Sequence, residues 1–321
     1  MKKLLHTLLP LVTLLMACSS QIQNTPEGFS DERNGLVDPT QQAFQEACVD
    51  QSRQDGPWKN DLVLSWFDSK GQEESQTLVK GGGVPTVIQE EDGTLLAAFQ
   101  WFPCDNAEAF DQVAVSMSED DGVTWSEPEL IEIEDFPEAY QRPFDPTLAL
   151  LPDGRIRIYY TSNANGLSTF NGDTQIYSAI SDDGIHYTFE EGSRWAVEEL
   201  PAYDSAVGYW DGLWHIITPN NIPDANGGAH HGSSEDGLTF TTQEDLDFTA
   251  KLNWTGNFVT REDGLYFYGT AEGTGNWWTY FDGEEWSEVD ALQTRGGDPA
   301  VACIQEDRCF IITVQMPGLK L

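Results

Sequence analysis

Three aspartates have the type and placement needed for acid–base chemistry. Asp145, Asp204 and Asp298 each stand just before a run of β-forming residues, and prolines follow the first and the last of them. Glycoside hydrolysis requires two carboxyl groups about 5 to 10 Å apart, one protonated and one ionised. An aspartate at the start of a strand is also a common turn residue, so a catalytic and a structural interpretation stay open.

Six other side chains are candidates for binding a substrate. Arginines pair with carboxylates or hydroxyls through two hydrogen bonds, and aromatic faces stack on sugar rings. The candidates are Arg142, Arg295, Tyr203, Trp101, Trp254 and His231. The two arginines could instead neutralise the aspartates. No metal site is expected, because the adjacent His230 and His231 would face opposite sides of a strand. No other cofactor is predicted.

A repeated hairpin places the three aspartates. A small or acidic residue, an apolar run, an acidic turn and a second apolar run recur at 84–97, 145–156, 204–214, 257–266 and 298–310. A second hairpin lies between consecutive copies. Two hairpins per repeat form a four-stranded blade, so the sequence predicts an all-β, five-bladed β-propeller, with six blades as the alternative.

The last copy lacks an outer hairpin because the sequence ends at Leu321. The apolar segments 62–67 and 76–79 can supply it, which would close the ring by pairing strands from the two ends of the chain. In this arrangement the acidic turns lie on one face. The blade-to-blade connections, with the aspartates, lie at the other end of the central channel, which we call the mouth.

The second hairpin of the first full repeat contains Ser118-Glu119-Asp120-Asp121-Gly122-Val123-Thr124-Trp125, and weaker forms follow at 181–187, 233–240 and 281–286. This octapeptide resembles the Asp box of sialidases and other β-propeller proteins. The resemblance implies a propeller. Its Asp and Thr are expected to hydrogen-bond the turn rather than to act in catalysis.

Two further resemblances concern function. Residues 82–87 with 93–97 resemble the first blade of sialidases, with Gly83 where that family has Arg. Asp145-Pro146 and Asp298-Pro299 resemble five-bladed glycosidases of the arabinanase, xylosidase and fructosidase type, with Val84 where those enzymes carry a catalytic Asp. The resemblances imply a propeller that binds glycans, with hydrolysis left open. The alternative is a non-catalytic propeller for protein–protein interaction or adhesion.

The N-terminus is predicted to be a signal rather than part of the fold. Lys2 and Lys3 precede an apolar run, and Leu15-Met16-Ala17-Cys18 matches the bacterial lipobox. This resemblance implies a signal peptide at 1–17, lipidation of Cys18 and retention in the cell envelope, at the outer membrane because no Asp follows the cysteine. We expect a flexible tether at 18–56 and the propeller at 57–321.

Charge and cysteine content limit the partners and the compartment. The net charge of −38 disfavours nucleic acid and anionic lipid surfaces as partners. Four cysteines besides Cys18 fit an oxidising compartment. Cys303 and Cys309 are expected to bridge a hairpin, which leaves Cys48 with Cys104. A monomer bound to a glycan and anchored to a membrane by lipid is the expected state.

Overall fold

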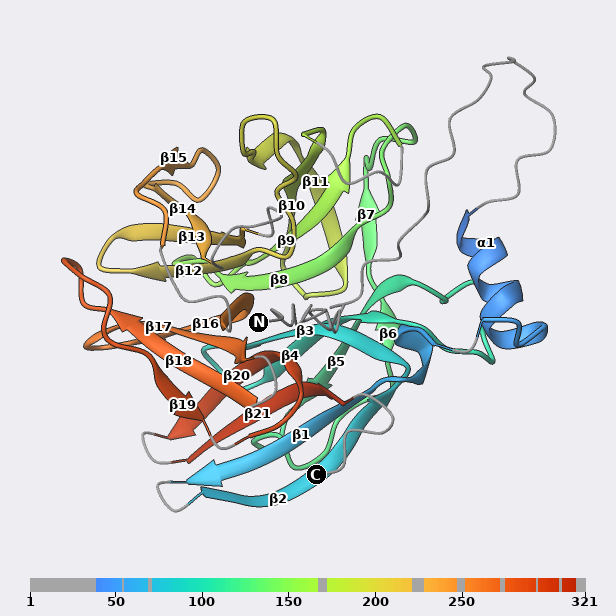
Figure 1. The fold of residues 1–321 in the computed structure, drawn as a ribbon, viewed down its shortest axis with the longest axis horizontal. Helices are drawn as coiled ribbons and strands as arrows, with labels where there is room; N and C mark the ends of the chain where they lie inside the picture. The colour runs from blue at the N-terminus through green and yellow to red at the C-terminus, as the bar shows by residue number, and fades with distance from the viewer. Residues whose placement is uncertain are drawn as a thin grey trace, which may run out of the picture.

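The computed structural model describes residues 39–53, 55–68, 71–166, 172–220, 228–246, 252–271, 275–292, 294–305 and 308–315. The predicted signal peptide and Cys18 lie outside this part of the chain. Five antiparallel sheets stand around a central axis, so the predicted five-bladed propeller is confirmed (Figure 1).

Each blade has four strands, and its first strand in the repeat is the innermost. The first blade is β3 (Gly82–Gln89), β4 (Leu95–Trp101), β5 (Gln112–Ser118) and β6 (Glu129–Leu130). The second is β8 (Phe144–Leu150), β9 (Ile156–Asn163), β10 (Thr174–Ser181) and β11 (His186–Trp195), with β7 (Glu132–Glu134) added parallel at its outer edge. The third is β12 (Ala206–Trp210), β13 (Leu213–Pro219), β14 (Ala229–Ser234) and β15 (Thr241–Thr242). The fourth is β16 (Leu252–Arg261), β17 (Gly264–Ala271), β18 (Gly275–Phe281) and β19 (Asp290–Leu292).

The fifth blade joins the two ends of the propeller. Its order is β2 (Gly71–Lys80), β1 (Asp61–Asp68), β21 (Arg308–Gln315) and β20 (Gly297–Gln305). Antiparallel pairing of β1 with β21 sets Leu64 opposite Ile312. The predicted closure is therefore confirmed, and it leaves no open edge between the first and last repeats.

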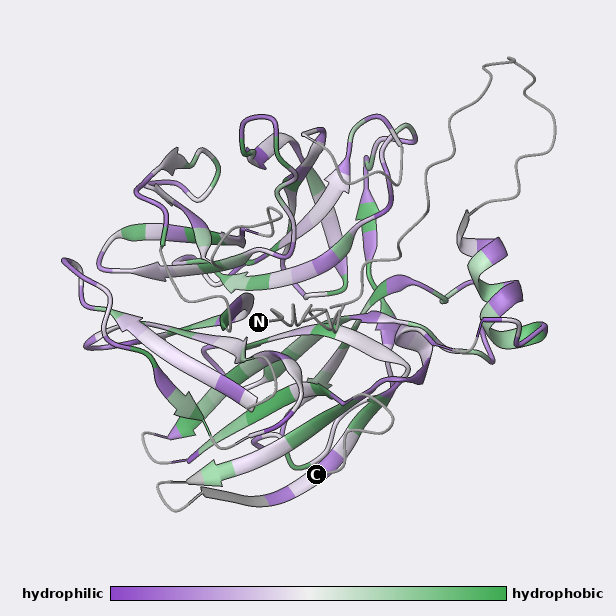
Figure 2. Cartoon of the chain, in the orientation of Figure 1, coloured by the Kyte–Doolittle hydropathy of each residue, from purple (hydrophilic) through white to green (hydrophobic). Residues whose placement is uncertain are grey.

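The hydrophobic core lies between the blades. Leu64 and Phe310 of the fifth blade pack with Phe99 of the first in one cluster, and all three are fully buried. Figure 2 shows hydrophobic residues concentrated in the strands, while hydrophilic residues occupy many of the turns. Burial of these sheet faces against one another holds the ring together.

The outer hairpins also end in acidic turns, and the turn at 118–125 contacts the preceding blade. The Asp120 carboxylate accepts hydrogen bonds from the Thr124 N–H (2.8 Å) and hydroxyl (2.6 Å), and the Ser118 hydroxyl accepts one from the Gly122 N–H (2.9 Å). Gly122 has a φ of 81°, in the left-handed region that glycine adopts without strain. The Trp125 ring packs edge-on against Phe310 of the fifth blade. The hydrogen bonds and ring packing are those expected of a structural element.

The N-terminal helical turns lie against the first blade. Helix α1 (Pro39–Phe44) continues into the π-helical turn η1 (Gln45–Val49), and the 3₁₀ turn η2 (Pro57–Lys59) precedes β1. The Phe44 ring packs edge-on against Phe110, and a disulfide joins Cys48 to Cys104. This part of the expected tether is therefore fastened to the propeller.

Both predicted disulfides are present, since Cys303 and Cys309 are also bonded. No helix in the described ranges combines the length and the hydrophobicity needed to span a membrane.

Candidate active site

The backbone presents the three aspartates at matching positions of three blades. Asp145, Asp204 and Asp298 have φ values of 49°, 50° and 47°, in the left-handed region that aspartate tolerates better than most residues. The first and last of these lie where the pairing register of β8 and β20 is interrupted. Each is followed by proline, which has no N–H for the ladder and favours such a bulge.

Threonines of the neighbouring second strands hold these aspartates. The Asp204 N–H donates to the Thr161 hydroxyl (3.1 Å), which itself donates to the Asp145 carboxylate (3.4 Å). The Asp298 N–H donates in the same way to the hydroxyl of Thr270 (2.9 Å). Sequence reasoning missed both threonines. Their signal is a threonine near the end of the second strand of the blade that precedes the aspartate.

The three carboxyl groups interact electrostatically. Burial, followed by the charge of Asp298, raises the pKa of Asp145 from 3.8 to about 7. Burial and the charges of both other aspartates raise the pKa of Asp204 well above its ordinary value, and Asp204 is only 8% exposed. Burial also raises the pKa of Asp298, against a hydrogen bond from Thr255. Asp298 therefore lies close enough to Asp145 and Asp204 for its charge to act on both.

A polar layer lies beneath the carboxyl groups. The buried Thr86 hydroxyl accepts hydrogen bonds from the Asn257 side chain (2.7 Å) and the Leu148 N–H (3.1 Å). Thr147 donates to the backbone carbonyl of Ser205. These bonds join the innermost strands of four blades across the channel.

Beyond this layer a cavity of about 480 Å³ opens towards the face with the acidic turns. Its lining includes Val87, Leu148, Val207, Phe258 and Val301 from the five innermost strands. This cavity is at the opposite end of the channel from the aspartates, so it is separate from their site.

Arg142 lies near Asp145 but forms an ion pair with Asp111. The other Asp111 oxygen accepts a hydrogen bond from Gln100 (2.5 Å), and Arg142 Nε donates to the hydroxyl of Thr40 in α1 (3.3 Å). Sequence reasoning missed Asp111 and Thr40. A lone aspartate in a long loop and a threonine far earlier in the chain carry no recognisable signal for this contact.

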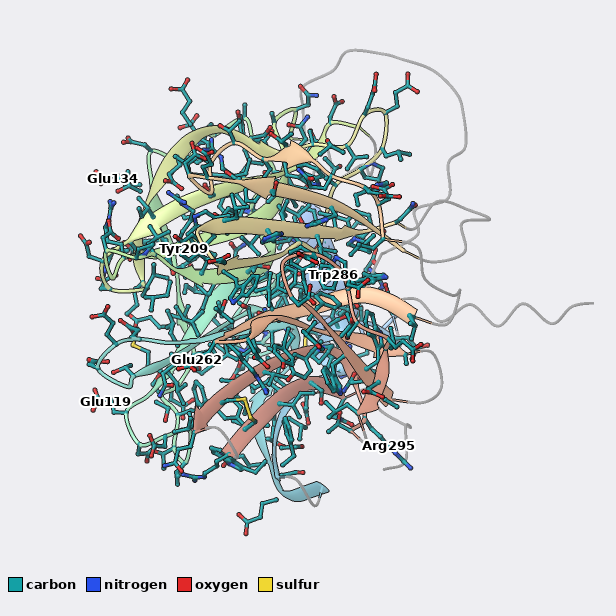
Figure 3. The ribbon with its side chains drawn as sticks, turned by 90° about the vertical axis from the view of Figure 1, so that its left-hand side faces the viewer. Glu119, Glu134, Tyr209, Glu262, Trp286 and Arg295 are labelled. Atoms are coloured by element: carbon teal, nitrogen blue, oxygen red, sulfur yellow. A yellow bond between two sulfur atoms is a disulfide. The ribbon has the colours of Figure 1, made fainter. Side chains whose placement is uncertain are left out.

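The other predicted binding residues differ in their exposure. Tyr203 and Trp101 are partly exposed, next to Asp204 and at the end of β4 respectively. Figure 3 shows Arg295 on the side opposite Glu119 and Glu262, with its side chain directed outwards. The backbone carbonyl of Arg295 accepts hydrogen bonds from Thr313 and Gln315.

The expectation that Trp254 and His231 contact a substrate is wrong. Trp254 is fully buried and its ring packs edge-on against Trp277 at 4.7 Å. His231 is 6% exposed and stacks on His215, with 3.1 Å between their ring nitrogens. Burial lowers the pKa of each histidine to about 4, which keeps both neutral in the core. Both rings also pack edge-on against Trp286, within one aromatic cluster.

No group of three or more His, Cys, Asp or Glu side chains in the described ranges is arranged to hold a metal ion.

The fold resembles that of carbohydrate-active propellers. A thermostable family-43 glycoside hydrolase matches with a TM-score of 0.54 and 10% identity, over 77% of this chain and 91% of its own. An α-L-arabinofuranosidase from Lactobacillus brevis matches with a TM-score of 0.53 and 12% identity, over 75% of this chain and 85% of its own. An N-acetylgalactosamine deacetylase from F. plautii, solved in complex with blood group B trisaccharide, also matches. Its TM-score is 0.53 and its identity 13%, over 76% of this chain and 82% of its own. At these identities the likeness shows the fold. No family model and no curated protein matches the sequence.

Proposed function

We propose that this protein binds glycans at the mouth of the propeller and hydrolyses their glycosidic bonds. The observation that carries the proposal is the placement of Asp145, Asp204 and Asp298 at matching positions of three blades, with Asp298 close enough for its charge to raise the pKa of the other two. Sharing of charge among close carboxyl groups keeps one protonated while another is ionised, which is the state that general acid–base catalysis needs.

The surroundings of each carboxyl group assign its role. Asp204 is the proton donor, because burial and two neighbouring charges favour its neutral form. Asp298 is assigned as the ionised carboxylate, because the hydrogen bond from Thr255 partly offsets the rise in its pKa that burial causes, whereas Asp204 has no such offset. Asp145 sets the charge balance between them. Its pKa of about 7 keeps a second proton at the site near neutral pH.

A carboxylate-to-amide exchange tests the proposal. Asparagine adopts positive φ readily, so Asp204→Asn preserves the backbone at φ 50°. We expect this variant to lose about 10²–10⁴-fold in turnover, the usual contribution of a general acid, while glycan binding persists. The measurement is product release from a panel of aryl glycosides and oligosaccharides, alongside a glycan-array binding assay.

Glu262→Gln is the matched control. It removes one exposed carboxylate from the opposite face (Figure 3), so turnover should stay unchanged. Absence of turnover in the unmutated protein across the panel would contradict the enzymatic part of the proposal.

Val84 favours the second candidate function, a non-catalytic glycan-binding or adhesion propeller. It occupies the first-blade position that matches the three aspartates and shares their geometry, with a φ of 44°. A valine there supplies no carboxyl group. Glycan binding without turnover would support this function, and recovery of an envelope protein in a pull-down without glycan binding would support protein–protein interaction.

We also propose that the protein is lipid-anchored through Cys18 in the outer membrane of the bacterial envelope. The support is the sequence Leu15-Met16-Ala17-Cys18 after a short apolar run. Incorporation of labelled palmitate, with loss of labelling in Cys18→Ser, is the measurement that checks the anchor.

A further inference from the structure

Two of the three nitrogens of the Arg142 guanidinium group are bonded within the protein. Its Nη2 pairs with the Asp111 carboxylate and its Nε donates to the Thr40 hydroxyl (3.3 Å). Its Nη1 is buried and has no hydrogen-bond partner within the described part of the chain. The Arg142 side chain is 26% exposed. A substrate carboxylate that reaches it would therefore have to displace Asp111 from Nη2 or Thr40 from Nε.

Asp111 is held in place for this contact. Its backbone N–H donates to the Trp101 carbonyl (2.7 Å), and its φ of 64° lies in the left-handed region. Gln100 donates to the carboxylate oxygen that does not pair with Arg142 (2.5 Å). These contacts come from β4 and from the loop before β5. The first blade therefore holds the Asp111 carboxylate against Arg142, which lies in the connection to the second blade.

The charges around the mouth are unbalanced. Asp145, Asp204 and Asp298 converge there, and Arg142 is already paired with a fourth carboxylate. The remaining predicted mouth cation, Arg295, has an exposed side chain directed outwards (Figure 3). Recognition of an anionic sugar needs a guanidinium or ammonium group presented to its carboxylate.

We propose that Asp111 is a specificity-determining residue: by occupying Arg142, it makes the mouth accept uncharged glycans and reject anionic ones. This inference rests on the proposed function in that the mouth is taken as the glycan site. It goes further by naming the substrate class and the residue that sets it. The guanidinium group is present beside the site, but the protein itself supplies its anion.

Removal of the Asp111 charge should weaken the preference of the mouth for uncharged over anionic glycans. Asparagine fits the φ of 64° and still offers an oxygen to Gln100, so Asp111→Asn removes the charge with little change in shape. We expect the ratio of anionic to uncharged ligand affinity to rise about tenfold, as for one charge-assisted hydrogen bond. The probes are methyl glucuronide against methyl glucoside, methyl galacturonide against methyl galactoside, and sialyllactose against lactose, measured by calorimetry.

A second readout needs no ligand. The groups that act on Asp145 are Asp298, Asp111, Arg142 and the Thr161 hydroxyl, and the charge of Asp145 in turn raises the pKa of Asp204. Asp111 raises the pKa of Asp145 and Arg142 lowers it. Carboxyl NMR titration should therefore show a lower pKa of Asp145 in Asp111→Asn and a higher one in Arg142→Gln.

The controls separate this inference from the proposed function. Glu262→Gln should change neither the affinity ratio nor the titration, because its carboxylate is on the opposite face. Equal binding of anionic and uncharged probes by the unmutated protein overturns the inference. Hydrolysis or binding of uncharged glycans with an unchanged ratio in Asp111→Asn overturns the inference alone. Failure of every probe and every glycan to bind overturns it together with the proposed function.

Discussion

At the scale of single residues, an uncommon backbone conformation marks the mouth. Asp145, Asp204, Asp298 and Val84 have φ values between 44° and 50°. Aspartate reaches this region at modest cost, whereas a β-branched side chain is crowded there. The three aspartates thus suit the conformation that presents them, and Val84 is strained in the same place.

Relief of this strain should stabilise the protein. We expect Val84→Asn to raise the free energy of unfolding by about 1 kcal/mol, because asparagine tolerates the left-handed region and Val84 is only partly buried. Urea denaturation measures the change. Val123→Asn is the control, since Val123 is 54% exposed and is not among the residues with positive φ. A stability equal to or below that of the control would argue against strain at Val84.

At the scale of elements, the N-terminal helical turns connect the first blade to the mouth. The disulfide between Cys48 and Cys104 and the packing of Phe44 on Phe110 hold α1 in place. From there Thr40 reaches Arg142, 102 residues later in the chain. This short segment therefore contributes to the surroundings of the candidate site although it precedes the propeller in sequence.

The two disulfides should differ in their effect on stability. Cys48 and Cys104 are 56 residues apart, and Cys303 and Cys309 only 6. Because a longer loop loses more entropy on closure, we expect replacement of the first pair by serine to cost about 2–5 kcal/mol and replacement of the second to cost less.

Thermal unfolding measures the loss, and hydrogen exchange should show faster exchange in α1 only when the first pair is removed. The reverse order of costs would contradict the loop-entropy explanation.

At the scale of the whole molecule, the two ends of the channel respond oppositely to pH. In the acidic turns, hydrogen bonds from Thr124 lower the pKa of Asp120, and backbone hydrogen bonds led by that of Leu238 lower the pKa of Asp236. Ionisation of these groups stabilises the fold above their ordinary pKa of 3.8, and this stability is lost in stronger acid. At the mouth the pKa values are raised, so ionisation there destabilises the fold.

The maximum of stability should therefore lie at acidic pH. Between the ordinary pKa of 3.8 and the folded value of about 7, folded Asp145 binds more protons than the unfolded chain, so stability falls as the pH rises through this window. We expect the highest free energy of unfolding at about pH 4–5, with a decline towards neutral pH of at most about 1.4 kcal/mol per unit of raised pKa.

Denaturant titration over this range measures the decline. Asp145→Asn should flatten it and Glu262→Gln should not. General repulsion from the net charge of −38 adds a decline of the same sign that salt screens. A slope that vanishes entirely in high salt would therefore assign the effect to net charge rather than to the mouth.

The sequence by itself determined the hairpins, the five blades, the closure by segments 62–67 and 76–79, and both disulfides. Each of these depends on local patterns: alternation along a strand, Asp-Gly turns, and cysteines in an oxidised chain. It also selected Asp145, Asp204 and Asp298, because equivalent positions of a repeat converge at the axis.

The tertiary structure decided which side chains face the mouth. Trp254 and His231 had suitable chemistry, but packing against neighbouring aromatic rings buries both. The Asp111 partner of Arg142 comes from a loop 31 residues away, and Thr40 from a helix pinned by a disulfide. Side-chain direction and long-range contacts depend on how the blades pack against one another, and no local pattern in the sequence records that packing.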